Sequence, residues 1–198
     1  MADLKRAKHF ILSELEERLP DYLSYHDLGH TLYVHKIACM LAEEFGIDEE
    51  DRVLLETAAL YHDCGFLNTY RDHEEAGCLT ARDVLPGFGY SEEQIERICE
   101  IILATKVPQS PQNFLSELLC DADLHYLGGT EYDFIAGNLY KEFQEQKIVQ
   151  SEDSWYKMQI GFLENHRFFN PYSKEHCEPG KQRNLERIKA DYARFLSA

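Results

Sequence analysis

The sequence of 198 residues predicts an all-α protein, and two patterns support this fold class. Apolar residues recur mainly at spacings of three and four, which matches one face of a helix. Alternating runs of β-branched residues, which are typical of strands, are absent. Apolar residues make up 44% of the chain and charged residues 28%, as in an ordinary folded globular protein. We therefore expect a helical bundle with a C-terminal helical extension.

Capping residues and helix breakers delimit the helices of the first two thirds of the chain. Pro20 ends the first helix because its ring clashes with the preceding turn, and Gly46 is a typical C-terminal cap for the second. Asp48 is a good N-cap for the third helix, and Ser91 with Gln94 forms a capping-box pattern for the fifth. The expected helices cover about residues 3–19, 27–45, 48–62, 72–84, 91–106 and 113–127.

Three further helices are expected in the last third of the chain, at about residues 131–146, 151–166 and 182–196. Asn170-Pro171 is interpreted as a break that precedes the last of them. The sequence contains no internal repeat and no low-complexity linker. Residues 1–198 are therefore interpreted as a single helical domain, in which about residues 131–198 form the extension.

The chain is strongly acidic, with 36 Asp and Glu residues against 20 Lys and Arg residues and a formal net charge of −16. Such a surface repels phosphate polymers, so a nucleic acid partner is not expected. A small anionic substrate is still compatible with this charge, because a bound cation reverses the local sign inside a pocket. The sequence also allows association into a homo-oligomer.

No segment of the sequence suits a membrane or an export signal. The N-terminus runs directly into a charged amphipathic stretch, and no window approaches about 18 uninterrupted apolar residues. The six cysteines show no C-x-x-C pair, and several lie on apolar helix faces, which favours buried reduced thiols. These features predict a cytoplasmic protein without a membrane partner.

Three short segments place ionisable residues inside or beside apolar helices. His26 and His30 lie four residues apart at a helix start, so both rings can project from one face. His62-Asp63 ends a buried helical run, where an unpaired carboxylate is unfavourable. Asp121 and Asp123 lie within an apolar helix, where burial needs a counter-charge. A metal ion would meet these needs, and imidazole with carboxylate suits Mn, Fe, Co, Ni or Zn better than Ca, with Mg as a further alternative.

Together these segments resemble a known family signature. The order Tyr25-His26-x3-His30, then His62-Asp63-x-Gly65, then Asp121-Ala122-Asp123-Leu124 is similar to the H…HD…D signature of the HD superfamily of metal-dependent phosphohydrolases. The resemblance covers about residues 20–130 and implies an HD-domain-like helical bundle. It also implies a divalent metal ion whose ligands are His30, His62, Asp63 and Asp123.

The resemblance implies further roles around these ligands. His26 matches the histidine that protonates the leaving oxygen in phosphodiesterase-like members, and the alternative is a histidine that merely packs on Tyr25. Asp63 or Asp123 is also expected to orient the attacking water. Asp121 points away from Asp123 on a helix, so we expect either an outer role beside the ligands or a surface position.

The sequence departs from two-metal members of the superfamily at one place. His73 matches a position where those members supply another ligand, but Thr105 and Lys106 stand where a further histidine would be expected. We therefore expect one metal ion per chain, with His73 nearby as an outer or substrate-binding group. Arg71 and Lys106 are candidates to bind the substrate phosphate, and Lys106 also to neutralise charge during catalysis. Ordinary solvated cations explain both residues equally well.

The function that the resemblance implies is hydrolysis of a phosphate ester by attack of a metal-bound water. The expected substrate is a nucleotide or another small phosphorylated metabolite, cut as a monoester or a diester. One alternative is a two-iron HD-type oxygenase, against which Thr105 argues because it replaces a ligand. The other alternative is a non-catalytic nucleotide-binding module, against which the intact set of metal ligands argues.

Overall fold

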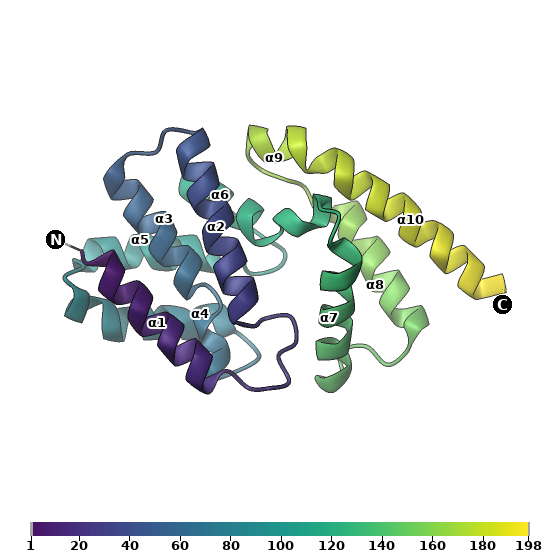
Figure 1. Cartoon of the computed structure of the whole chain (residues 1–198), viewed down its shortest axis with the longest axis horizontal. Helices are drawn as coiled ribbons and strands as arrows, with labels where there is room; N and C mark the ends of the chain where they lie inside the picture. Colours follow the sequence, from purple (N-terminus) through teal and green to yellow (C-terminus); the bar gives the residue numbers. More distant parts are fainter. Residues whose placement is uncertain (1, 198) are drawn as a thin grey trace. The chain divides into compact units, whose positions relative to one another are not determined.

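The computed structural model describes residues 2–197, and these residues form helices, turns and loops without a strand. This confirms the predicted all-α class. The chain divides into two compact units, one ending at Asp123 and one beginning at Leu124, and each unit is described by itself (Figure 1). The interpretation of the chain as a single domain stays a prediction. None of the described helices combines the length and the apolar character that a membrane span needs.

The α-helices described in the first unit follow the predicted caps. The Asp48 carboxylate accepts the Asp51 N–H at 2.9 Å, and Ser91 forms the expected capping box with Gln94. Gly46 has a positive φ of 61° just after the second helix, as a left-handed C-terminal cap requires. The helices are α1 (Leu4–Arg18), α2 (Leu28–Glu44), α3 (Glu49–Tyr61), α4 (His73–Val84), α5 (Glu92–Leu103) and α6 (Phe114–Asp123).

Helix α3 is the buried centre of the first unit. It packs against α1, α2, α5 and α6, and Figure 1 shows α2 and α3 side by side. Leu54, Leu55 and Leu60 are fully buried, which explains the nearly continuous apolar run ahead of His62. Each fully buried leucine stabilises the fold by about 1.5–3 kcal/mol relative to an exposed one. The C-terminal end of α3 is therefore held in place by the core.

Two helices of the first unit end earlier than the sequence predicts. Helix α5 stops at Leu103, because the N–H and the hydroxyl of Thr105 both donate to the Ile102 carbonyl, at 3.0 and 2.8 Å, and close the helix. Helix α6 stops at Asp123, and a 3₁₀ helix, His125–Gly128, follows where a last α-helical turn was expected. Apolar spacing cannot separate these two states, because side chains of a 3₁₀ helix also repeat every three residues.

In the second unit the sequence prediction missed one short helix. The predicted break is present, since residues 166–170 lie outside any helix, but the Asn170 side chain accepts the Ser173 N–H at 2.8 Å and caps an unpredicted helix that Pro171 begins. Helix α8 packs against α10, and the Tyr132 hydroxyl of α7 donates to Gln159 of α8 at 3.1 Å. The α-helices described in this unit are α7 (Tyr132–Glu145), α8 (Glu152–Asn165), α9 (Pro171–His176) and α10 (Glu178–Ser197).

Helix α10 begins at Glu178, earlier than the predicted start near residue 182. Pro179 is tolerated there because the N–H groups of a first turn have no helical partner. Gly180 lets the first turn of α10 pack closely against the backbone at Gly128, since a Cβ at position 180 would collide with the Gly128 carbonyl oxygen. The Pro-Gly pair, which often marks a turn, therefore lies inside the first turn of a helix.

A glycine in the first unit generates a test of the packing that surrounds His62 and Asp63. A Cβ at Gly65 would collide with the His73 carbonyl oxygen and would lie 2.8 Å from the Gly77 nitrogen, and both are backbone atoms. We predict that Gly65→Ala lowers the free energy of unfolding by about 2–3 kcal/mol, measured by urea denaturation, because the two segments must separate. Gly87→Ala is the control, since a Cβ there meets nothing within 4 Å. Equal losses in both variants would contradict the close approach.

Candidate metal centre

Two imidazoles meet between the packed helices α2 and α3. The Asp27 carboxylate caps α2 by accepting the His30 N–H at 2.8 Å, which fixes the first turn of that helix. His62 follows the last residue of α3, and its Nδ1 lies 2.8 Å from the Ala59 carbonyl oxygen. A carbonyl oxygen only accepts, so Nδ1 of His62 carries a proton and donates it. The Nε2 atoms of the two histidines then lie 3.3 Å apart.

Asp63 and Asp123 each bring one oxygen to this imidazole pair. Asp63 Oδ2 lies 3.3 Å from Nε2 of His30 and 3.1 Å from Nε2 of His62. Asp123, the last residue of α6, places Oδ1 3.2 Å from Nε2 of His30 and 3.8 Å from Nε2 of His62. The structure thus brings together the four residues that the sequence predicts as metal ligands.

The spacing of these atoms fits a divalent metal ion. Zinc and similar ions hold nitrogen and oxygen ligands at about 2.0–2.2 Å, which places neighbouring ligand atoms about 3–3.5 Å apart. The separations above run from 3.1 to 3.8 Å, and one ligand atom each from His30, His62 and Asp123 lies within 4.8 Å of the other two. Asp63 lies outside that mutual group and joins the centre through its distances to His30 and His62. Asp63 Oδ2 is also buried without a hydrogen-bond partner, although it lies between two imidazole nitrogens. A cation bound to these side chains would satisfy that oxygen.

In the metal-free protein, protons balance the two carboxylates. Burial lowers the pKa of His30, but the nearby carboxylates of Asp123 and Asp63 outweigh burial and raise this pKa to about 10. Burial also opposes the charged form of His62, yet the neighbouring Asp63 carboxylate raises the pKa of His62 above its ordinary value. Burial favours the neutral form of Asp63, but His62 and His30 hold its pKa well below its usual range. A metal ion must therefore displace protons from the imidazoles.

Aromatic and acidic side chains lie around Oδ1 of Asp63, the outer oxygen, which faces away from the imidazole pair. His73, the first residue of α4, places Nε2 3.4 Å from Asp63 Oδ1 and 3.5 Å from Glu74 Oε1. The Phe66 ring stacks on His73 with a centroid distance of 3.9 Å and contacts His26 at 4.4 Å. His26 and His73 therefore lie beside the centre, with ring centroids 6.0 Å apart. Their predicted roles, in proton transfer and in substrate binding, stay predictions.

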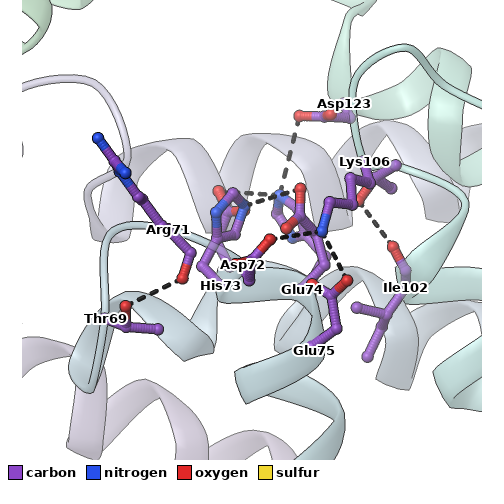
Figure 2. Close-up of polar contacts among 12 residues, drawn as sticks. Thr69, Arg71, Asp72, His73, Glu74, Glu75, Ile102, Lys106 and Asp123 are labelled. Carbon is purple, nitrogen blue, oxygen red and sulfur yellow. Dashed lines mark hydrogen bonds and ion pairs between the residues drawn. The ribbon is translucent and has the colours of Figure 1, made fainter. Parts of the chain in front are cut away.

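Lys106 binds two carboxylates at the start of α4. Its ammonium lies 2.7 Å from Asp72 Oδ1 and 2.6 Å from Glu75 Oε1, as Figure 2 shows. Asp72 itself has a left-handed φ of 53°, a conformation that aspartate adopts more readily than most residues other than glycine. Arg71 is exposed, and in Figure 2 its guanidinium lies apart from the Lys106 ammonium. Phosphate binding by Arg71 and Lys106 stays a prediction.

The helical fold and the ligand geometry agree with a known family. A model of the HD domain matches residues 27–125, half of the chain, and this range includes His30, His62, Asp63 and Asp123. The chain belongs to the HD domain family. This confirms the resemblance that the three sequence segments carry. HD domains bind divalent metals, so these four residues are the candidate ligands of this HD domain.

A solved structure shares the fold of this HD-domain protein. The crystal structure of a predicted HD superfamily hydrolase from an uncultured Thermotogales bacterium matches with a TM-score of 0.60 and 20% sequence identity. The match covers 94% of this chain and 92% of that protein, so it includes the C-terminal helices. This likeness supports the fold class. None of the curated proteins compared with the chain matches it.

The burial of individual side chains decides one alternative that the sequence left open, at Asp121, and reveals residues that the sequence prediction missed. Asp121 is fully buried, so the surface alternative is wrong, and an outer role beside Asp123 stays a prediction. Glu74 is buried as well, although the first turn of α4 looks like an ordinary acidic helix start. Its only signal in the sequence is its position next to His73. Phe66 gave no signal, because nothing in the sequence indicates that an apolar ring lies against two histidines.

The HD centre generates a prediction about pH, because protons and metal compete at His30. The pKa of His30 rises on folding from 6.5 to about 10. Its contribution to the stability of the metal-free protein is therefore complete below about pH 6.5 and is lost as the pH rises through about 10. Metal binding needs the neutral ring and gains as the pH rises. We predict that a fixed excess of Mn²⁺ raises the free energy of unfolding more at about pH 8 than at about pH 6.5.

Chemical denaturation with Mn²⁺ or with a chelator measures this gain. An ion at 100 times its dissociation constant adds about 2.7 kcal/mol. His30→Ala should remove the gain at both pH values, because this variant lacks one of the metal ligands. A gain that is equal at both pH values in the parent protein would show that His30 does not exchange a proton for the ion.

Proposed function

We propose that this chain is a metal-dependent phosphohydrolase that cleaves the phosphate ester of a nucleotide or another small phosphorylated metabolite. The observation that carries the proposal is the buried Asp63 Oδ2 atom, which lacks a hydrogen-bond partner although it lies 3.3 and 3.1 Å from the Nε2 atoms of His30 and His62. Membership of the HD family and the likeness to a predicted HD superfamily hydrolase support hydrolysis. The net charge of −16 favours a small substrate over a nucleic acid polymer.

The ligand side chains are fixed before a substrate binds. A divalent cation held by His30, His62, Asp63 and Asp123 would supply a Lewis acid that polarises a phosphoryl oxygen and lowers the pKa of water. The Ala59 carbonyl orients the ring of His62, and the capped first turn of α2 positions His30. Little reorganisation is then needed during the reaction, which is the condition for strong electrostatic stabilisation of a transition state.

Asp63 has a second oxygen that suits a water molecule. Oδ2 faces the imidazole pair, whereas Oδ1 lies 3.4 Å from Nε2 of His73. In the metal-free protein the charge of His62 outweighs burial and holds the pKa of Asp63 well below its usual range. A bound cation would favour the ionised carboxylate in the same way. Oδ1 can therefore accept a hydrogen bond from the attacking water and align the water with the phosphorus atom.

His26 is the group that we propose protonates the leaving oxygen. Its ring is half-buried between Phe66 and Tyr25, at centroid distances of 4.4 and 4.5 Å. These contacts fix the plane of the ring beside the centre. As an imidazolium, His26 would donate its proton to the departing oxygen, and a general acid of this kind contributes about 10²–10⁴-fold to the rate.

Basic residues at the start of α4 complete the proposed substrate site. Arg71 is exposed, so its guanidinium can bind a phosphate without first breaking a buried contact. Lys106 already binds Asp72 and Glu75. We propose that the Lys106 ammonium offsets the repulsion between these two carboxylates and the phosphate of an incoming substrate. His73, the first residue of α4, is the proposed substrate-binding group beside it.

A panel of phosphate esters tests the reaction class. The chain is stripped of metal, reconstituted separately with Mn, Fe, Co, Ni or Zn, and assayed on nucleoside monophosphates, nucleoside polyphosphates and cyclic nucleotides. We expect hydrolysis of at least one class, and a loss of more than about 100-fold in Asp63→Ala together with the loss of bound metal. O₂ consumption by the iron-loaded protein without hydrolysis would indicate the oxygenase. Nucleotide binding without turnover would indicate the binding module.

A separate prediction distinguishes His26 from His30, which lie four residues apart. His30→Ala should lose metal and activity together, because His30 is a candidate ligand. His26→Ala should keep the metal and lower kcat by about 10²-fold or more, because only proton donation is removed. The loss in His26→Ala should shrink for a nitrophenyl ester, whose leaving group needs little protonation. An equal loss of metal in both variants, measured by elemental analysis, would refute this division of roles.

A further inference from the structure

A second cluster of metal-binding side chains lies in the first unit, between α2 and α3. His35 and Cys39 are four residues apart on α2, and Glu56 comes from α3. His35 Nε2 lies 3.2 Å from Glu56 Oε2, and Cys39 Sγ lies 3.8 Å from each ring nitrogen of His35. One ligand atom from each residue lies within 4.8 Å of the other two. His35 and Glu56 are buried and Cys39 is half-buried.

These separations suit a four-coordinate zinc ion. With Zn–N and Zn–O distances of about 2.0–2.1 Å and a Zn–S distance of about 2.3 Å, tetrahedral ligand atoms lie about 3.3–3.7 Å apart. The distance from His35 to Glu56 is 3.2 Å, that from His35 to Cys39 is 3.8 Å, and the three ligand atoms lie within 4.8 Å of one another, so the side chains must draw together slightly on a bound ion. Imidazole and thiolate ligands select zinc over magnesium or calcium. Three protein ligands would leave a fourth position for water.

Arg52 holds the Glu56 carboxylate in the orientation that such a site needs. Arg52 Nε donates to Glu56 Oε1 at 2.8 Å, while Oε2 is the oxygen that faces His35. Ligating carboxylates are commonly held by an outer hydrogen-bond donor in this way. The hydrogen bond with His35 outweighs burial and, with that from Arg52, lowers the pKa of Glu56 to about 2. The carboxylate is therefore ionised at neutral pH.

We propose that His35, Cys39 and Glu56 form a zinc site that is separate from the centre at His30 and His62. His35 lies five positions after His30 on α2, which corresponds to a rise of about 7.5 Å along the helix axis. The proposed site contains a thiol, whereas the ligands of the HD centre are imidazoles and carboxylates only. The two sites should therefore differ in their preference for soft and hard ions. This proposal does not depend on the hydrolytic function proposed above.

Nearby charges and a proton set the strength of the proposed zinc site. Burial and the charge of Glu56 raise the pKa of the Cys39 thiol to about 11, so zinc must displace the thiol proton. Arg52 and Lys8 add positive charge near the thiol, and this charge repels an incoming zinc ion. The affinity should therefore rise with pH and stay below that of a closed structural site built from thiolates alone.

Cobalt titration tests the proposal, because a cobalt–thiolate bond gives a near-ultraviolet charge-transfer band that nitrogen and oxygen ligands do not give. The full-length chain is stripped of metal and titrated with Co²⁺, followed by Zn²⁺. We expect a band that saturates with Co²⁺ and that Zn²⁺ abolishes. Cys39→Ser should lose the band and a single equivalent of bound cobalt, because serine is a poor ligand for such ions.

Two matched variants separate this site from the HD centre. Asp123→Asn removes a candidate ligand of the HD centre and should keep the band. Cys177→Ser changes a buried thiol of the second unit and should also keep it. The Mn²⁺-dependent gain in stability should persist in Cys39→Ser, which verifies that this variant is folded. No band in the parent protein, or a band that survives in Cys39→Ser, would overturn the proposal.

Discussion

The burial of α3 is the constraint on which the metal centre depends. Every residue from Leu54 to Tyr61 is buried, so a shift or rotation of this helix would expose apolar surface at about 25 cal/mol per Å². His62-Asp63 follows directly on this buried segment, and the core therefore sets the directions of both side chains. Gly65 then lets the chain pass close to the backbone of α4, and this passage brings His73 to the outer oxygen of Asp63.

The four ionisable groups of the centre form a compensated cluster in two different chemical states. Two carboxylates face two imidazoles, and burial makes any uncompensated charge among them costly. In the metal-free protein, the raised pKa values of His30 and His62 supply the positive charge as protons. In the metal-bound protein, a divalent cation supplies it instead. The same arrangement of side chains is therefore compatible with both states, which explains how a folded core tolerates so many ionisable groups.

The sequence predicted the helices where local signals agree with the packing, and it failed where one signal has two meanings. The cap at Asp48 and the apolar spacing after it both indicate a helix, and α3 forms there. Pro171 and Pro179 could mark either a turn or a first helical turn, so α9 was missed and the start of α10 was placed too late. The ligands could be predicted because they lie in short local motifs. The positions of Glu74 and Phe66 depend on how α4 packs against the preceding segment, which no local pattern encodes.

Asp123 is the last residue of α6 and also the last residue of the first unit. All four candidate ligands are therefore encoded before the second unit begins at Leu124. Helices α2, α3 and α6, which carry or adjoin these ligands, pack against one another within the first unit. The donor set is thus a property of one continuous stretch of sequence, in which a buried core and a coordination geometry are specified by the same three helices.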